Sequence, residues 1–471
     1  MFKVSKGSIY YIGGSKMDTT LNHKQKLYMD MSYADYFNVK ARGLSKKVEN
    51  LVQCDNFCAY DIDESNLIRR EILQFKNQYP NTHNVLYINI PFCATRCGYC
   101  PYFVEIYNKS RVCEYLDALE LEIDRIKDTP YVKSTEFECL YFGGGTPSML
   151  STSEIKRLLT KVFSSFSFTS DGEFTFESNP ATLTEQKILM FKEIGINRVS
   201  LGIQTFNDRI LKEMDCAHNS DKARLVINQL LNIGISVNAD MIFGYQSQSE
   251  DDIVRDIMEL KSIENLNQVT YFPLRIIDNT ELEKYNYGKE KITIEQHNKK
   301  LLKLDKLVDT NMTNIGYIRE ESPIFYFNKN SHKHRYISTS ARVLGLGAGG
   351  GTLIDYGESI NHSDIEEYIS NLKKNGYGTK SAAFLTKEQA FERHILYSIV
   401  YLNRSLSDFK DVINSNFKDY YNVSADDRIE KVISDMKKLK FIYEDDNGKL
   451  IITKRMWNVL GQIQIGVPSI I

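Results

Sequence analysis

Three cysteines with a short, regular spacing are the strongest chemical signal in this chain of 471 residues. Cys93, Cys97 and Cys100 form a Cys-x3-Cys-x2-Cys pattern that closely follows the apolar, β-prone run of residues 85–90. Clustered thiolates are soft ligands for zinc or for an iron–sulfur cluster, and a structural zinc site needs four ligands. Because neither of the two residues after Cys100 is a cysteine, the local ligands stop at three. Three thiolates on a four-iron cluster would leave one iron open to an exogenous ligand, whereas the alternatives are a zinc knuckle or buried free cysteines.

Polar residues that could bind a ligand follow further strand-like segments. One turn contains Gly143, Gly144, Gly145 and Thr146. Consecutive glycines permit close backbone approach and leave N–H and C=O groups for a polar ligand, although a plain turn is the alternative. The polar residues that end the next three segments are Glu177, Gln204 and Asp240. Carboxylates accept hydrogen bonds and amides both donate and accept them, so we expect these residues, with Tyr87 ahead of the cysteines, to bind a cofactor.

Strand-like and helix-like segments alternate along the central part of the chain. The six expected strands cover residues 85–90, 139–142, 173–177, 198–202, 236–242 and 267–273. The helical patterns between them cover residues 111–127, 153–163, 184–194, 208–213 with 220–232, and 249–262. Strands separated by helices predict parallel β-α-β units, which make a partial (β/α)6 barrel or an open α/β sheet. Catalytic groups of barrels lie at the C-terminal ends of the strands, where the glycine turn and the polar residues above are placed.

Five motifs within residues 87–278 resemble the oxygen-independent coproporphyrinogen III oxidase and haem-chaperone family of radical S-adenosylmethionine (SAM) proteins. They read YINIPFCATRCGYC, YFGGGTPS, FESNP, RVSLGIQTFND and NADMIFGY, and weaker likeness continues towards the end of the chain. The resemblance implies a radical SAM barrel in which Cys93, Cys97 and Cys100 hold a [4Fe-4S] cluster whose open iron chelates SAM. It also implies reductive cleavage of SAM to a 5′-deoxyadenosyl radical, with a flavodoxin- or ferredoxin-type electron donor.

Three positions depart from the family pattern. A fourth cysteine is common two residues after Cys100, where this chain has Tyr102. A histidine commonly stands where this chain has Asn89, and an arginine where it has Cys216. These changes put porphyrinogen decarboxylation in doubt and favour the three-cysteine branch of the family, which contains methyltransferases and chaperones.

Three functions remain open on this basis. The first is a radical methyltransferase that uses one or two SAM molecules on a planar sp2 substrate such as a tetrapyrrole. Its catalytic candidates are Cys216, as a reactive thiol, and Tyr271, which with Phe272 and Arg275 would suit a planar anionic substrate. A buried inert cysteine and ordinary barrel packing are the alternatives for these residues. The second function is a chaperone in which His218 or another histidine ligates haem, and the third is a coproporphyrinogen oxidase with altered ligands.

Composition limits the partners and the location that we expect. The chain has 59 Lys+Arg and 61 Asp+Glu residues, for a net charge of -2, so nothing favours nucleic acid or an anionic membrane as a partner. No apolar run is long enough to span a bilayer, and the N-terminal residues lack a signal-peptide core. We therefore expect a cytoplasmic protein with reduced thiols, in which Cys54 and Cys58 are ordinary thiols rather than ligands of an auxiliary cluster.

We expect four parts along the chain. They are an N-terminal extension at residues 1–80, the partial barrel at 81–320, a connecting segment that completes the barrel at 321–384, and a C-terminal module at 385–471. The glycine run at 345–351 predicts a tight loop near a ligand or the barrel edge. In the module, helical patterns at 386–401, 407–414 and 425–438 precede a hairpin whose turn is Asp446-Asn447-Gly448, which is typical of a winged-helix-like α+β fold. The mixed charge of this module disfavours DNA binding.

Overall fold

The structure is a computed structural model of the chain. It describes residues 2–5, 8–11, 62–77, 84–100, 104–274, 294–319, 325–328, 342–354, 357–384, 404–407, 410, 425–438 and 440–453. Predictions that lie outside these residues concern Cys54, Cys58, Tyr102, Arg275, residues 386–401 and most of residues 407–414. The division of the chain into four parts stays a prediction.

Six parallel strands form the centre of one twelve-stranded sheet. They are β3 (Asn84–Ile90), β6 (Glu136–Gly144), β7 (Ser167–Ser178), β8 (Arg198–Gln204), β9 (Ser236–Phe243) and β10 (Gln268–Pro273). Each strand pairs in parallel with the next one along the chain, as in a (β/α) barrel, whereas a doubly wound sheet would reverse its order. The six strands expected from the sequence are all present, and the predicted partial barrel is confirmed.

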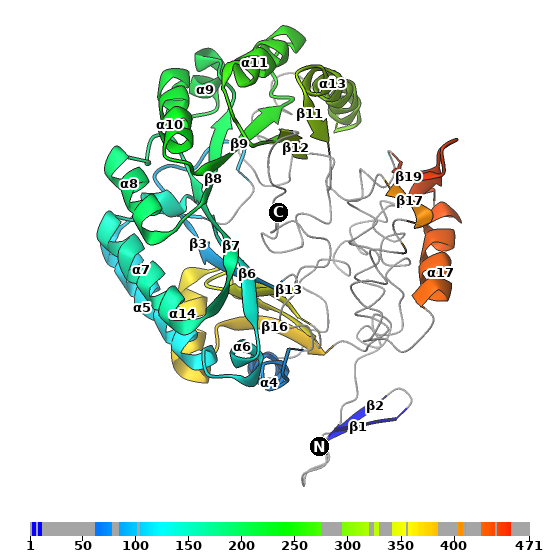
Figure 1. The fold of residues 1–471 in the computed structure, drawn as a ribbon. Coiled ribbons are helices and arrows are strands. Elements are labelled where there is room, and N and C mark those ends of the chain that lie inside the picture. The colour runs from blue at the N-terminus through cyan, green and yellow to red at the C-terminus, as the bar shows by residue number, and fades with distance from the viewer. Residues whose placement is uncertain are drawn as a thin grey trace.

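Helices connect these strands and cover the outer side of the curved sheet (Figure 1). They are α5 (Lys109–Ile126), α7 (Thr152–Ser165), α8 (Glu185–Ile194), α9 (Asp208–Glu213), α10 (Ser220–Asn232) and α11 (Glu250–Ser262), with the short α6 (Pro130–Lys133) and the 3-10 turn η2 (Pro147–Met149). Local chemistry sets their ends, because Ser151 and Ser249 form capping boxes with Glu154 and Asp252 at the start of α7 and α11. Gly195 ends α8 in the left-handed conformation.

The sheet continues on both sides of the parallel strands. Beyond β10 lie the antiparallel strands β12 (Phe325–Asn328) and β11 (Tyr317–Arg319), which follow helix α13 (Ile294–Asn314). Beyond β3 lie β13 (Arg342–Leu346), which is parallel to it, and then β14 (Gly351–Ile354), β15 (Gly357–Asn361) and β16 (Thr379–Phe384). The glycine run therefore forms the turn from β13 to β14 beside the first barrel strand.

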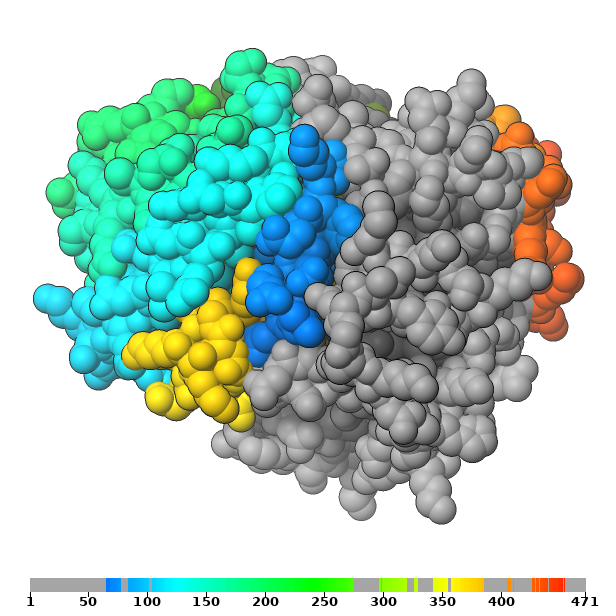
Figure 2. All heavy atoms as spheres, turned by 90° about the horizontal axis from the view of Figure 1, so that it is seen from below, coloured from blue at the N-terminus to red at the C-terminus, as the bar shows by residue number. Residues whose placement is uncertain are grey.

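Two fully buried charges hold this turn in place. Arg69 of α4 (Ile62–Ile72) donates to the Ser359 hydroxyl at 2.9 Å, and Glu122 of α5 accepts hydrogen bonds from Gly347 N–H and Asn361 Nδ2, both at 2.8 Å. Burial lowers the pKa of Arg69 and raises that of Glu122, while their mutual attraction opposes both shifts. Helix α4 packs on β15 and β16, and its blue surface adjoins the yellow surface of α14 (Ile365–Asn375) and β16 in Figure 2.

The remaining described elements are short. They are β1 (Phe2–Ser5), β2 (Ser8–Tyr11), β4 (Phe92–Cys93), β5 (Glu105–Ile106), β17 (Arg404–Ser405), α17 (Ala425–Lys438), β18 (Ile442–Glu444) and β19 (Lys449–Ile452). The hairpin β18–β19 forms as expected, with Gly448 in the left-handed conformation of its turn. None of the helices in the described ranges is both long and apolar enough to cross a bilayer.

Candidate active site

The cysteine loop follows β3, and its three cysteines are partly exposed and form no disulfide. Cys93 ends β4, and the Cys100 N–H donates to the Cys97 carbonyl at 3.1 Å in the turn that follows. Within the described part of the chain, no three His, Cys, Asp or Glu side chains are placed to hold a single metal ion. A structural zinc ion takes four ligands, so the three cysteines of this loop alone do not close a zinc site. Burial raises the pKa of Cys93 to about 11, so a bound metal would have to displace its proton.

The glycine turn packs directly on the cysteine loop. The Thr146 N–H donates to the Phe92 carbonyl at 2.8 Å, and the Thr146 hydroxyl lies 3.4 Å from the Cys93 sulfur. A Cβ at Gly145 would meet the Phe92 carbonyl at 2.7 Å and the Cys93 sulfur at 2.9 Å. Glycine is therefore required here, and the two loops form one unit at the C-terminal edge of β3 and β6. Three cysteines on this unit, none of them in a disulfide, fit a [4Fe-4S] cluster with one open iron.

Glu177 lies inside the barrel and joins β7 to the glycine turn. Its Oε1 accepts a hydrogen bond from the Tyr141 hydroxyl at 2.8 Å, and its Oε2 accepts one from the Gly144 N–H at 3.0 Å. The Tyr87 ring stacks on Tyr141 with 5.9 Å between centroids, and a Cβ at Gly143 would lie 2.7 Å from the Tyr87 hydroxyl. Burial raises the pKa of Glu177 to about 7, although both hydrogen bonds favour the ionised carboxylate.

Asp240 is a second, half-buried carboxyl on the interior of the barrel. Ser200 donates to its Oδ2 and the Asn238 amide to its Oδ1, both at 2.8 Å. Burial raises the pKa of Asp240 to about 6, while these hydrogen bonds and the buried guanidinium of Arg198 oppose the shift. Asp240 in turn raises the pKa of Glu177. The two carboxyls therefore share one electrostatic environment beside the glycine turn.

Gln204 ends β8 with an irregular backbone. Its φ of 67° lies in the left-handed region, and the pairing of β8 with β9 shifts register between Gly202 and Gln204. A Cβ at Gly202 would lie 2.9 Å from Gln204 Nε2, so the amide group of Gln204 lies over Gly202. Gly202 is the partner of Asp240 in the sheet. The structure thus brings the glycine turn, Glu177, Asp240 and Gln204 to one edge of the barrel.

The residues that form this edge lie in a segment that matches a known protein family. A family model for the radical SAM superfamily matches residues 87–260, which contain the cysteine loop and every strand end named above. The chain carries a radical SAM domain.

Two curated relatives are similar to part of this chain, and both matches cover only part of each protein. The haem chaperone HemW of Buchnera aphidicola is 34% identical over 197 residues, which are 41% of this chain and 51% of the relative. Anaerobilin synthase of Escherichia coli O157:H7 is 31% identical over 201 residues, which are 42% of this chain and 45% of the relative. The chain thus matches about half of the length of these relatives.

A solved structure supports the fold over most of the chain. Coproporphyrinogen III oxidase (HemN) from Escherichia coli, a radical SAM enzyme, aligns with a TM-score of 0.67 at 20% identity. The alignment covers 84% of this chain and 93% of that chain. At this identity the likeness establishes a shared fold and no shared activity.

Tyr271 does not line the interior of the radical SAM barrel, contrary to the expectation from the sequence. Side chains alternate along β10, so Thr270, whose hydroxyl donates to Asn238 at 2.9 Å, faces inward and Tyr271 faces the helices. Tyr271 is 1% exposed, and its ring lies 5.9 Å from that of Phe243 between centroids. The structure places it in the hydrophobic core between the sheet and the helices, on the opposite face of β10 from Thr270.

Cys216 and His218 follow α9 and differ in their surroundings. Cys216 and Tyr99 of the cysteine loop pack against the same apolar cluster, so the thiol lies near the site. Burial raises the pKa of Cys216 to about 12, so it is a neutral thiol, and its reactive role stays a prediction. His218 is buried, and its Nε2 lies 3.1 Å from the Ile203 carbonyl, so that nitrogen is occupied by the chain itself.

Several interior residues that support the site were not singled out from the sequence. Tyr141 holds Glu177, and Ser200 and Asn238 hold Asp240. Tyr141 lies two residues before Gly143, and Asn238 lies two residues before Asp240. Because a strand repeats its facing every two residues, counting back by two from each strand-end candidate would have found both of them.

Glu177 and Asp240 predict a contribution to the stability of the ligand-free protein that is lost as the pH rises towards neutrality. The pKa values of about 7 for Glu177 and about 6 for Asp240 in the folded chain exceed the ~4 of unfolded carboxyls. The folded state therefore binds more protons than the unfolded state in this range, and the free energy of unfolding falls as the pH rises through it. Thermal unfolding between about pH 5 and pH 8 measures this loss, which should be smaller in Glu177→Gln. An equal loss in that variant would show that Glu177 does not titrate in this range.

Proposed function

We propose that this protein is a radical SAM methyltransferase that acts on a planar tetrapyrrole such as haem. The observation that carries the proposal is the joined unit of the three-cysteine loop, the glycine turn and Glu177, beside Asp240 and Gln204. The names of two relatives and of the solved structure, which are a haem chaperone, anaerobilin synthase and coproporphyrinogen III oxidase, support a tetrapyrrole as the ligand class. The absence of a fourth local cysteine supports the methyltransferase branch over coproporphyrinogen oxidation.

The residues of the site would divide into ligands of the cluster and groups that bind SAM. Cys93, Cys97 and Cys100 would hold the [4Fe-4S] cluster, which supplies one electron for the reductive cleavage of SAM. Backbone groups of the glycine turn would bind the amino-acid end of SAM. Glu177, Asp240 and Gln204 would accept hydrogen bonds from its ammonium and hydroxyl groups. Tyr141 would keep the Glu177 carboxyl in a fixed orientation through its hydrogen bond to Oε1.

A haem chaperone is the second candidate, because a curated HemW is 34% identical over 197 residues. Such a protein needs a haem ligand, and the histidines in the described ranges do not offer one readily. His218, His297 and His362 are all buried, and each has a ring nitrogen on a carbonyl or a carboxylate of the chain. The other ring nitrogen of His218 and of His362 has no hydrogen-bond partner among the described residues, so burial rather than hydrogen bonding separates these imidazoles from a bound haem. A flavodoxin- or ferredoxin-type electron donor, a second SAM molecule and a cytoplasmic location stay predictions.

A product assay on anaerobically reconstituted protein with SAM, a reductant and haem distinguishes these functions. A methyltransferase of this kind consumes two SAM molecules per turnover, so 5′-deoxyadenosine and S-adenosylhomocysteine should form in equal amounts and only when haem is added. The Cys97→Ala variant, assayed in parallel, gives the background. A stoichiometric Soret band without S-adenosylhomocysteine would instead identify a chaperone. Protoporphyrinogen formed from coproporphyrinogen III would identify an oxidase.

A further inference from the structure

Gln204 adopts a backbone conformation that a residue with a side chain rarely takes. Its φ is 67°, and the Thr205 N–H donates to the Ile203 carbonyl at 2.8 Å, which closes a tight three-residue turn around it. For a residue other than glycine, this conformation is strained and persists only where the surroundings hold it. The turn directly ends β8 at the edge of the site.

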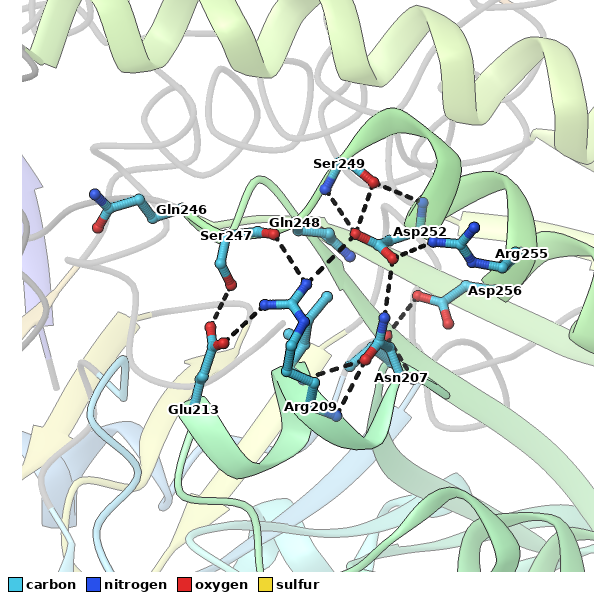
Figure 3. A network of polar contacts seen from close by, with 12 residues as sticks. Asn207, Arg209, Glu213, Gln246, Ser247, Gln248, Ser249, Asp252, Arg255 and Asp256 are labelled. Atoms are coloured by element: carbon cyan, nitrogen blue, oxygen red, sulfur yellow. Dashed lines mark hydrogen bonds and ion pairs between the residues drawn. The ribbon is translucent and has the colours of Figure 1, made fainter.

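Helix α11 holds the segment that follows the strained residue. Asp256 accepts a hydrogen bond from the Thr205 hydroxyl on Oδ2 and one from the Phe206 N–H on Oδ1, both at 2.7 Å. One helical turn earlier, Asp252 Oδ1 accepts from Asn207 Nδ2 at 2.9 Å. Figure 3 shows Asp252 and Asp256 pointing from α11 towards Asn207 and the chain beside it. The three residues after Gln204 are therefore all bound to one face of α11.

Asp256 is a buried carboxyl in a position that costs folding free energy. Asp256 is 2% exposed, and among the described residues it has no cationic partner within ion-pair distance. Burial raises its pKa to about 7, although the bonds from Thr205 and Phe206 favour the ionised carboxylate, and the charges of Asp252 and Glu259 raise it further. A buried carboxyl without a cation destabilises a protein relative to an apolar residue, so its presence calls for a local reason.

We propose that Asp256 and Thr205 are positioning residues that hold Gln204 in its left-handed conformation and so direct its amide over Gly202 towards Asp240. Without these bonds, Gln204 would relax to an extended backbone and its amide would leave this edge. The effect of Asp256 and Thr205 on the backbone of Gln204 concerns the chain alone and needs no ligand. The part of the proposal that concerns SAM rests on the proposed function.

The first experiment measures strain without any ligand. Glycine tolerates a positive φ and alanine does not, so Gln204→Gly should melt about 2 °C or more above Gln204→Ala in the ligand-free protein. At an ordinary position the order is the reverse, because glycine has more unfolded-state entropy to lose. In a Thr205→Val background the advantage of glycine should vanish, because the turn is then free to relax. An unchanged advantage in that background, or no advantage in the parent, would overturn the proposal.

The second experiment connects the turn to SAM. Thr205→Val should weaken SAM binding by the anaerobically reconstituted protein about tenfold, whereas Thr205→Ser, which keeps the hydroxyl, should stay within about twofold of the parent. Asp256→Ala, which removes the acceptor of both the Thr205 hydroxyl and the Phe206 N–H, should shift affinity in the same direction and serves if Thr205→Val does not fold. Equal SAM affinity in all variants would overturn the positioning role. If the parent binds no SAM, the proposed function fails, while the melting comparison still decides the effect on the backbone of Gln204.

Discussion

Replacing Cys97 with alanine should remove the iron–sulfur chromophore and SAM cleavage together. Two remaining thiolates are too few to hold a four-iron cluster. The measurement is the iron and sulfide content and the visible spectrum after anaerobic reconstitution, followed by quantification of 5′-deoxyadenosine. Both quantities should fall to the level of a sample without protein.

Cys113→Ala is the matched control for this prediction. Cys113 is also a free, partly exposed thiol, but it lies on helix α5 and not on the cysteine loop. Its loss should leave the cluster content unchanged. If Cys97→Ala kept both its colour and SAM cleavage, or if Cys113→Ala lost them equally, the assignment of the cluster ligands would be wrong.

Replacing Gly144 with valine should weaken SAM binding by at least about tenfold, or ~1.4 kcal/mol. Gly144 has a φ of 119°, and a Cβ there would lie 2.3 Å from Asn89 Oδ1 and 3.0 Å from the Ile90 carbonyl. The turn would have to move, and the bond from the Gly144 N–H to Glu177 would be lost with it. The SAM dissociation constant of the reconstituted protein measures this effect.

Gly195→Val is the matched control for Gly144→Val. It places the same side chain at a positive φ outside the site, so it shows how much stability is lost through backbone strain alone. Gly195 ends α8 with a φ of 97°, and a Cβ there would have no neighbour within 4 Å. Both variants should lose stability through backbone strain of roughly 1–3 kcal/mol, but only Gly144→Val should lose SAM affinity. A folded Gly144→Val protein with the SAM affinity of the parent would contradict the role of the glycine turn.

The strands and the chemistry at their ends could be predicted because both are local. An apolar run such as residues 85–90 must be buried, and its length predicts a strand wherever it packs. Helix ends follow from nearby residues in the same way, as Ser249 with Asp252 shows at α11. Three thiols within eight residues will lie close together in almost any fold. These features carried the prediction of the barrel and of the cysteine loop.

The side of the sheet on which Tyr271 lies could not be predicted from the local sequence. The sequence placed it correctly in the last barrel strand, but the face on which it lies depends on the register with β9, where it pairs with Met241. A shift of one residue moves every side chain of a strand to the opposite face, and no local signal on β10 decides between the two faces. Pairing with the neighbouring strand turns Thr270 inward and leaves Tyr271 in the core.

The sequence by itself determined the set of reactive groups, which are the three thiols, the glycine turn and one polar residue at each of three strand ends. Only the tertiary structure decided how these groups are held. Thr205 and Asp256 are 51 residues apart along the chain, and Tyr141 and Glu177 are 36 apart, yet both pairs share hydrogen bonds. Contacts of this kind arise when the sheet closes and the helices pack on it, because burial forces each polar side chain to find a partner that no local pattern names.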